Sequence, residues 1–287
     1  MNRFLLAAVL AAALVVGVGS PAARPRATAI PDFGHVVVIV FENKDEGDVI
    51  RSSRAPAFNA LARRHAGFGR YVGVTHPSLP NYLALVSGST QGITTNCTSC
   101  LVSGRSLADT IESSGRTWKT YAEGLPRPGF TGCCAGRYAK KHNPFLYFRR
   151  VVSRPDRLRR VVPLTQLSRD LRAGSLPDFS LVVPDLCHDM HDCSVATGDR
   201  WLKGFVPPLL RSDTVVFVVF DESAGGSPAR ARIPALALGP LVRRGSTFTR
   251  TVSHYGLLRT IEDAWGLLRL GHSATATPIT GIWRLPQ

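Results

Sequence analysis

The stretch His35-Val-Val-Val-Ile-Val-Phe41 decides the fold of this chain, because it is an unbroken apolar run that ends directly at the polar pair Glu42-Asn43. Continuous rather than alternating hydrophobicity predicts a strand that is covered on both faces, which is typical of a parallel sheet between helices. Runs of the same kind predict further buried strands at residues 179–183, 214–220 and 233–238.

Helical patterns lie between these strands. Apolar residues at helical spacing, closed by a glycine or preceded by a cap, predict helices at residues 56–65, 79–87, 107–113, 164–173 and 254–265. This alternation predicts a three-layer α/β/α domain with a mostly parallel central sheet, spanning residues 24–287 as one unit. Residues 96–163 are rich in Pro, Gly, Cys and aromatic residues and show little periodicity, so they predict a long disulfide-stapled insertion.

Residues 1–23 have the layout of a secretory signal peptide, with Arg3 before an apolar run that is short for a membrane span. We therefore expect export to the medium or the cell envelope, with no transmembrane segment after cleavage. The net charge of +15 suggests anionic partners, but the arginines are dispersed and no nucleic-acid motif occurs. A specific nucleic-acid partner is therefore not expected, and the sequence carries no signal for an oligomeric state.

Six cysteines in an exported chain predict three disulfides. Cys133 and Cys134 are adjacent, and their Cα spacing of about 3.8 Å is shorter than disulfides prefer. We therefore expect each of them to pair separately with Cys97 or Cys100. The spacing Cys97-Thr-Ser-Cys100 is a weak redox motif, because no strand precedes it and no helix begins with it.

The loop Pro184-Asp-Leu-Cys-His-Asp-Met-His-Asp-Cys193 concentrates polar groups between the two remaining cysteines. Cys187 and Cys193 are expected to form a disulfide. A zinc site made by these cysteines with His188 and His191 is the alternative, but the Cys-x-x-Cys spacing is missing and export favours the disulfide. Two imidazoles and three carboxylates in so small a loop are costly to bury without a task.

Ser78 precedes the apolar helix predicted at 79–87, which Gly88 is suited to end. Pro80 fits the first turn, where its missing N–H leaves no helical bond unmade. A hydroxyl at this point faces free backbone N–H groups and the positive end of the helix dipole, which favours an alkoxide and attracts phosphate. The alternative is that Ser78 is a helix cap and nothing more.

Acidic pairs follow two of the predicted strands. Glu42-Asn43 follows the first strand and Asp221-Glu222 follows the strand at 214–220. Ligands of parallel sheets bind beyond the carboxyl ends of the strands, so these four side chains predict one site. Their oxygen donors suit a hard cation such as Ca²⁺, Mg²⁺ or Mn²⁺. The alternative is that these acids cap helices or close turns.

Several motifs, taken in order, resemble the bacterial phosphoesterase family of acid phosphatases and phospholipases C, which belongs to the alkaline-phosphatase-like superfamily. They are Phe41-Glu-Asn43, His76-Pro-Ser-Leu-Pro-Asn-Tyr82, Lys141-His-Asn-Pro-Phe145, Asp185-Leu-Cys-His-Asp-Met-His-Asp192, Phe220-Asp-Glu222 and Ser253-His-Tyr255. The resemblance implies the α/β/α core and a single divalent metal ion, for which Zn²⁺ or iron would be the alternatives to the hard cations. It implies metal ligands at Glu42, Asn43, Ser78, Asp221 and Glu222.

The same resemblance suggests roles for further side chains around the phosphoryl group. We expect catalytic roles for Ser78, His142, His188 and His191. We expect substrate-binding roles for His76, Asn81, Asn143 and His254. On their own, His142 beside Asn-Pro and His254 at a helix start are ambiguous and could be structural.

We therefore expect a secreted, metal-dependent phosphoric-ester hydrolase, most simply an acid phosphatase that acts on small phosphomonoesters through a phosphoserine intermediate. Ser78 would attack phosphorus, and His188 or His191 would protonate the leaving group. A phosphodiesterase or phospholipase C is the first alternative, although the long C-terminal extension of the family's phospholipases C is missing. A non-enzymatic basic envelope protein that binds anionic polymers is the second.

Overall fold

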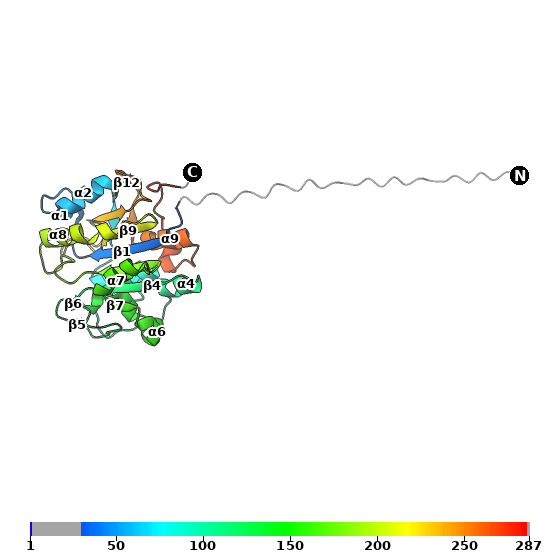
Figure 1. The fold of residues 1–287 in the computed structure, drawn as a ribbon, viewed down its shortest axis with the longest axis horizontal. Coiled ribbons are helices and arrows are strands. Elements are labelled where there is room, and N and C mark those ends of the chain that lie inside the picture. Colours follow the sequence, from blue (N-terminus) through cyan, green and yellow to red (C-terminus); the bar gives the residue numbers. More distant parts are fainter. Residues whose placement is uncertain (2–29, 286–287) are drawn as a thin grey trace.

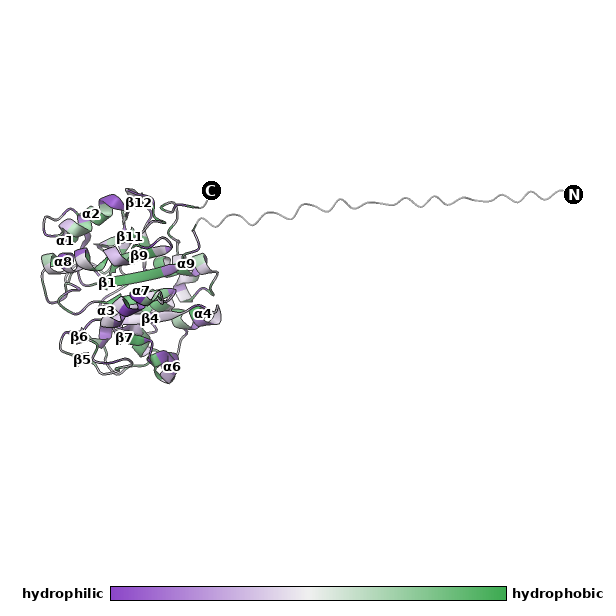
Figure 2. Ribbon diagram, in the orientation of Figure 1, coloured by the Kyte–Doolittle hydropathy of each residue, from purple (hydrophilic) through white to green (hydrophobic). Residues whose placement is uncertain are grey.

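The computed structural model describes Met1 and residues 30–285, so the expected signal peptide lies outside the described residues. Strand β1 (His35–Phe41) lies in the middle of the molecule (Figure 1). It pairs in parallel with β9 (Thr214–Phe220) on one side and β8 (Phe179–Val183) on the other. All three strands are buried and have the predicted bounds, and Figure 2 shows the apolar colouring of β1.

The central sheet has eight strands in the order β12-β2-β11-β9-β1-β8-β4-β7. The remaining members are β2 (Ala66–Phe68), β4 (Trp118–Ala122), β7 (Val161–Pro163), β11 (Ala235–Leu238) and β12 (Ser246–Phe248). Pairing is parallel except at β11, which runs antiparallel to both of its neighbours. The mostly parallel sheet is therefore confirmed.

The strand expected at residues 233–238 is divided at Pro234, which has no N–H to donate to a ladder. Its first part becomes β10 (Arg232–Ile233), which joins β3 (Tyr71–Val72) and β13 (Val252–Ser253) in a separate three-stranded sheet. Its second part becomes β11, the antiparallel member of the large sheet.

Helices cover the sheet on both faces, which completes the three layers (Figure 1). Helix α3 packs against α9 and α4, whereas α2 packs against α8. The α-helices are α1 (Glu46–Val49), α2 (Pro56–Arg64), α3 (Ser78–Ser87), α4 (Leu107–Ser113), α5 (Arg149–Val152), α6 (Pro155–Leu158), α7 (Thr165–Ala173), α8 (Val195–Phe205) and α9 (His254–Trp265). Short 3₁₀ turns are η1 (Lys140–His142), η2 (Pro144–Tyr147), η3 (Pro207–Leu209) and η4 (Gly271–Thr275). Within residues 30–285, no helix is both long and apolar enough to cross a bilayer.

Residues 96–163 are not a simple insertion, because they supply β4 and β7 to the central sheet. Strand β4 escaped sequence recognition since it carries Lys119 and Tyr121 among its apolar residues. Both side chains bind Asp170, with Lys119 Nζ and Tyr121 OH each 2.6 Å from Asp170 Oδ2. A long-range carboxylate therefore allows a strand without an unbroken apolar pattern to join the sheet.

The disulfides differ in part from the prediction. They join Cys97 to Cys100, Cys133 to Cys134, and Cys187 to Cys193. The last pair is confirmed, but the expected cross-links between the first two pairs are wrong. Each of those cysteines bonds to a neighbour along the chain, within one turn for the first pair and at the start of the hairpin of β5 (Cys134–Ala135) and β6 (Tyr138–Ala139) for the second.

Helix α3 ends at a close approach between two backbones. Gly88 has a left-handed conformation (φ 68°), and a Cβ atom there would overlap the Leu270 carbonyl oxygen. The Gly88 carbonyl also accepts a hydrogen bond from His272 N at 2.8 Å. The end of α3 is thus fastened to the turn that follows α9.

We expect Gly88→Ala to lower the free energy of unfolding by about 3 kcal/mol, because a strained φ and a backbone overlap act together. Gly92→Ala is the matched control: its φ is also positive, at 74°, but nothing lies within 4 Å of the added Cβ atom. It should cost about 1 kcal/mol. Urea denaturation of both variants measures the difference, and equal losses would contradict the proposed overlap.

Glu262 of α9 also binds the turn that follows α9. Its Oε1 accepts Leu270 N at 2.9 Å, and its Oε2 accepts the Ser273 hydroxyl at 2.5 Å. The carboxyl group is buried, and burial raises its pKa from the ordinary 4.5 to about 7. Between about pH 4.5 and pH 7, the folded protein therefore holds a proton on Glu262 that the unfolded chain releases.

Because the pKa of Glu262 is higher in the folded state, its contribution to stability is complete below about pH 4.5 and decreases as the pH rises to about 7. Glu262→Gln should remove this part of the pH dependence. The measurement is the free energy of unfolding of both proteins at about pH 5 and about pH 8. An unchanged difference between the two pH values in the variant would show that Glu262 is ionised in the fold.

Candidate active site

The register of two parallel strands brings the predicted acids together. Phe41 of β1 is paired with Phe220 of β9, so the next residues, Glu42 and Asp221, leave the sheet side by side at its carboxyl edge. Asn43 N donates to Asp221 Oδ1 at 3.1 Å, and Asn43 Nδ2 donates to Glu42 Oε2 at 3.3 Å. Residues distant in sequence therefore form one buried cluster.

Ser78 enters this cluster from the first residue of α3. Its hydroxyl lies 3.0 Å from Glu42 Oε2 and 3.1 Å from Glu222 Oε1, and the side chain is buried. A serine hydroxyl has one proton, so it can donate to only one of these carboxyl groups at a time. Glu42 and Glu222 thus lie against the Ser78 hydroxyl, and Asn43 joins the cluster through its hydrogen bonds to Glu42 and Asp221.

The electrostatics of the cluster call for a cation. Burial raises the pKa of Glu42 well above its ordinary value, and repulsion from Asp221 and Asp189 adds to the shift. Burial also raises the pKa of Asp221, and that of Glu222 to about 6. Within the described residues, Asp221 Oδ2 and Asp189 Oδ2 are buried without a hydrogen-bond partner. Crowded acids with unused oxygen atoms fit a divalent cation.

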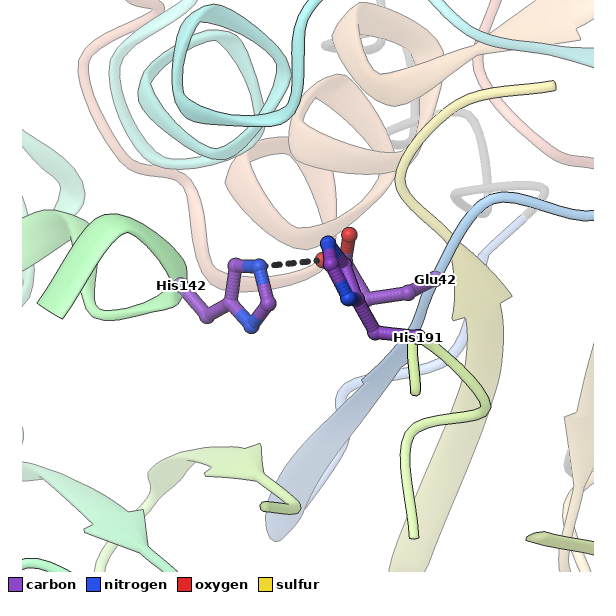
Figure 3. Close-up of side chains that lie close together, drawn as sticks. All are labelled: Glu42, His142 and His191. Carbon is purple, nitrogen blue, oxygen red and sulfur yellow. Dashed lines mark ion pairs between the residues drawn. The ribbon is translucent and has the colours of Figure 1, made fainter. Parts of the chain in front are cut away.

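His142 and His191 lie close to Glu42 (Figure 3). Each offers a ring nitrogen within 4.8 Å of a Glu42 oxygen. His142 is buried, and its Nε2 lies 3.2 Å from Glu42 Oε1 without hydrogen-bond alignment, which leaves that nitrogen unpartnered. Burial lowers the pKa of His142 well below its ordinary value, so the ring is neutral.

Two residues that sequence reasoning did not single out, Asp189 and Tyr82, also contact His142 and Glu42. Asp189 Oδ2 lies 3.2 Å from His142 Nδ1, and burial raises the pKa of Asp189 to about 8. Tyr82 donates its hydroxyl proton to Glu42 Oε1 at 2.6 Å, and its ring stacks on His142. The acid-rich loop was a signal for Asp189, whereas Tyr82 matched the apolar face of α3 and gave no signal of its own.

His188 belongs to a different group from the other predicted catalytic residues. Its Nδ1 lies 3.0 Å from Glu123 Oε2 and 3.6 Å from Asp185 Oδ1, and its ring stacks on Trp201. These contacts direct the imidazole toward Glu123 at the end of β4. The structure therefore brings His142 and His191 to Glu42 but places His188 in a neighbouring cluster.

The predicted substrate-binding residues have protein partners. Asn81 accepts from Val74 N and Thr75 N and donates to the carbonyls of Thr75 and Pro77. Its hydrogen-bonding capacity is thus used by the turn before Ser78. The amide shapes the turn that presents the serine, and substrate binding at this position stays a prediction.

His254 also has protein partners for its polar atoms. It is buried, with Nε2 2.6 Å from the Asp221 carbonyl oxygen and Nδ1 3.1 Å from Tyr71 OH. Burial lowers its pKa to about 4, so the neutral ring donates from Nε2 and accepts at Nδ1. Both nitrogens are engaged, and His254 positions the backbone of Asp221.

His76 and Asn143 occupy the margins of the site. His76 Nδ1 lies 2.6 Å from Glu222 Oε2, and its other ring nitrogen lies 3.1 Å from the Ser227 carbonyl oxygen. Asn143 follows His142 in the sequence. Its side chain is buried, and its Nδ2 donates to Tyr138 OH at 3.3 Å. Its Oδ1 has no partner among residues 30–285. His76 thus orients Glu222, while one oxygen of Asn143 stays available.

Comparison with known sequences identifies relatives over nearly the whole chain. The Phosphoesterase family matches residues 48–268. A phosphatidylinositol-3-phosphatase of Mycobacterium tuberculosis is 39% identical over 284 residues, covering 96% of this chain and 92% of the relative. An acid phosphatase of Aspergillus fumigatus is 28% identical over 281 residues. The match covers 93% of this chain and 62% of the relative.

Solved structures show a similar fold. A protein in the alkaline phosphatase superfamily from Vibrio parahaemolyticus superposes with a TM-score of 0.60 at 12% identity, covering 86% of this chain and 70% of that one. Murine ectonucleotide pyrophosphatase/phosphodiesterase 5 in complex with AMP has a TM-score of 0.55 at 12% identity, covering 83% and 96%. At such low identity these likenesses concern the fold alone, which is alkaline-phosphatase-like.

The family match and the sequence relatives define one class of protein, the hydrolases of phosphoric esters. Within that class, the chain belongs to the Phosphoesterase family. The resemblance inferred from the motifs is therefore confirmed.

Asp221→Asn tests whether the acids at the sheet edge share a cation. It removes a charge and a strong oxygen donor with little change of volume, so metal affinity should fall about tenfold or more. Added Mg²⁺, Mn²⁺ or Ca²⁺ should then raise the melting temperature less than in the wild type, because ligand-linked stabilisation follows occupancy. Asp32→Asn is the control, since Asp32 is an exposed acid that precedes β1. Equal metal responses in all three proteins would exclude a shared cation at Asp221.

Proposed function

We propose that the protein is an exported, metal-dependent acid phosphatase that hydrolyses phosphomonoesters through a phosphoserine intermediate. The observation that carries the proposal is the Ser78 hydroxyl, held at the first residue of a buried helix between Glu42 and Glu222. The names of the relatives support a phosphatase, because the two described above are a phosphatidylinositol-3-phosphatase and an acid phosphatase.

Ser78 is the proposed nucleophile. Its Oγ attacks phosphorus, its proton passes to a neighbouring carboxylate, and the bond to the leaving alkoxide breaks. The start of α3, a helix of ten residues, faces the reacting group with the positive end of its dipole. A divalent cation held by Glu42, Asn43, Ser78, Asp221 and Glu222 would lower the pKa of the serine hydroxyl and offset negative charge on the phosphoryl oxygens.

The two histidines near Glu42 have different roles: one binds the phosphoryl group and the other transfers protons to and from the leaving group and water. The unpartnered Nε2 of the neutral His142 is suited to hydrogen-bond a phosphoryl oxygen. We assign the proton transfers to His191 rather than His188, because His191 is the one near Glu42. Asp192 Oδ1, 2.6 Å from His191 Nδ1, would orient the imidazole for these proton transfers. Proton donation by a protonated histidine to the alkoxide is consistent with an acid optimum.

The second half of the reaction reverses these roles. Water attacks the phosphorus of phospho-Ser78, His191 takes a proton from that water, and the Ser78 oxygen leaves and recovers its proton. Asn81 and His254 act at a distance in this scheme, since they hold the turn before Ser78 and the backbone of Asp221. A phosphoinositide monoester is a substrate to test, in view of the name of the M. tuberculosis relative.

Ser78→Ala should abolish the phosphoenzyme and reduce turnover of p-nitrophenyl phosphate by about a thousandfold or more. The fold should persist, with a stability change of about 1 kcal/mol, because only one hydroxyl is lost. Acid quenching followed by mass spectrometry detects the phosphoserine. Ser87→Ala, at the other end of the same helix, is the control and should retain activity. Retention of more than about a tenth of wild-type turnover by Ser78→Ala would remove Ser78 from the nucleophile's role.

A further inference from the structure

Lys141 lies at the edge of the site and has no role in the scheme above. It belongs to η1, next to His142, and its side chain is partly buried. Its Nζ atom lies 3.0 Å from His191 Nε2. An ammonium group can only donate hydrogen bonds, so Lys141 donates to the imidazole, whose own proton then sits on Nδ1 facing Asp192.

The partner of Lys141 is weaker than those of the lysines around it. Lys140 donates to the Thr98 carbonyl oxygen and lies over the Tyr147 ring, and Lys44 donates to the carbonyls of Asn43 and Met190. Within residues 30–285, Lys141 forms no ion pair with a carboxylate, and a neutral imidazole nitrogen is its hydrogen-bond partner. An ammonium group with so weak a partner can readily exchange it for an incoming anion.

The charge of Lys141 already reaches the centre of the site. Burial is the largest influence on the pKa of Glu42 and raises it, whereas the positive charge of Lys141 lowers it. The same charge adds to the effect of burial in lowering the pKa of His142. The geometry agrees, because Lys141 Nζ contacts His191 and a ring nitrogen of His191 lies within 4.8 Å of a Glu42 oxygen.

The acidic side chains around the site make the Lys141 ammonium group important for one class of substrate. Glu42, Asp189, Asp221 and Glu222 are buried close together at the site, so an anionic substrate enters strongly acidic surroundings. A phosphomonoester carries a charge of about −1.5 to −2 near neutral pH. A diester keeps a single ionisable oxygen and a charge of −1. The penalty for entering an acidic site is therefore larger for the monoester, unless a second cation meets its extra charge.

We propose that Lys141 recognises the second negative charge of the substrate and makes this site selective for phosphomonoesters over diesters. The inference rests on the proposed phosphatase function. On binding, Lys141 exchanges His191 Nε2 for a phosphoryl oxygen of the monoester, and this exchange also frees that nitrogen for proton transfer. A diester bears a second ester group where the charged oxygen of a monoester would be, so it gains less from the ammonium group.

The test compares kcat/KM for p-nitrophenyl phosphate and bis(p-nitrophenyl) phosphate in the metal-loaded protein near neutral pH, where the monoester carries its second charge. Lys141→Met keeps most of the side-chain volume and removes the charge. We expect the ratio of monoester to diester kcat/KM to fall about tenfold to a hundredfold, with the diester value changed less than about twofold. Lys141→Arg restores the charge and should recover most of the ratio.

An equilibrium readout separates binding from turnover. Inorganic phosphate should inhibit Lys141→Met more weakly than the wild type by a similar factor, whereas inhibition by dimethyl phosphate, a singly charged diester, should not change. Lys203→Met is the charge-matched control, because Lys203 is exposed on α8, and it should leave both ratios unaltered. If Lys141→Met is unstable by circular dichroism, Lys141→Gln and Lys141→Arg provide the same neutral-to-charged comparison.

The outcomes distinguish the two proposals. A parallel loss of monoester and diester activity in Lys141→Met, or an unchanged ratio, would overturn the role of Lys141 and leave the phosphatase function intact. Failure of Lys141→Arg to recover the ratio would do the same, because it would point to packing rather than charge. A wild-type protein that hydrolyses neither ester would instead refute the proposed function.

Discussion

The structure depends on the in-register parallel pairing of β1 with β9, which delivers Glu42 and Asp221 to the same buried edge. Two carboxyl groups in such a position repel each other and lose hydration, and this cost shows in their raised pKa values, for which burial is the leading cause. The sheet can accommodate them because its own pairing on both sides holds the two strand ends in place. The apolar sheet thus stabilises an acid cluster that would not form in a more flexible setting.

The polar residues around the acids fall into two sets with different tasks. One set meets the reacting region: Ser78 donates to Glu42 or Glu222, and Tyr82 fixes the other oxygen of Glu42. The second set binds backbone: Asn81 ties the turn before Ser78, and His254 holds the carbonyl of Asp221. Residues of both sets lie within the motifs quoted in the sequence analysis, so a motif alone does not separate chemistry from positioning.

Much of the fold could be predicted from the chain, since β1, β8, β9 and most helices carry unbroken apolar runs or helical periodicity that reflect burial directly. The elements that escaped recognition depend on distant partners. Strand β4 joins the sheet because Asp170 satisfies its Lys119 and Tyr121, and the cysteine pairs are chosen by local turns that composition does not reveal. An apolar pattern that predicts burial is visible within one segment, whereas a side-chain or cysteine partner is found only by considering two segments together.

By itself, the sequence determined the class of sheet, the acids at its carboxyl edge and the serine at a helix tip, because strand ends and helix starts are local features of the chain. Only the tertiary structure decided which candidates share a site. It brought His142, His191 and Asp189 to Glu42, turned His188 toward Glu123, and used Asn81 and His254 to hold backbone. The physical reason is that a side chain's role depends on which neighbours satisfy its hydrogen bonds and charge, and those neighbours lie far away in the sequence.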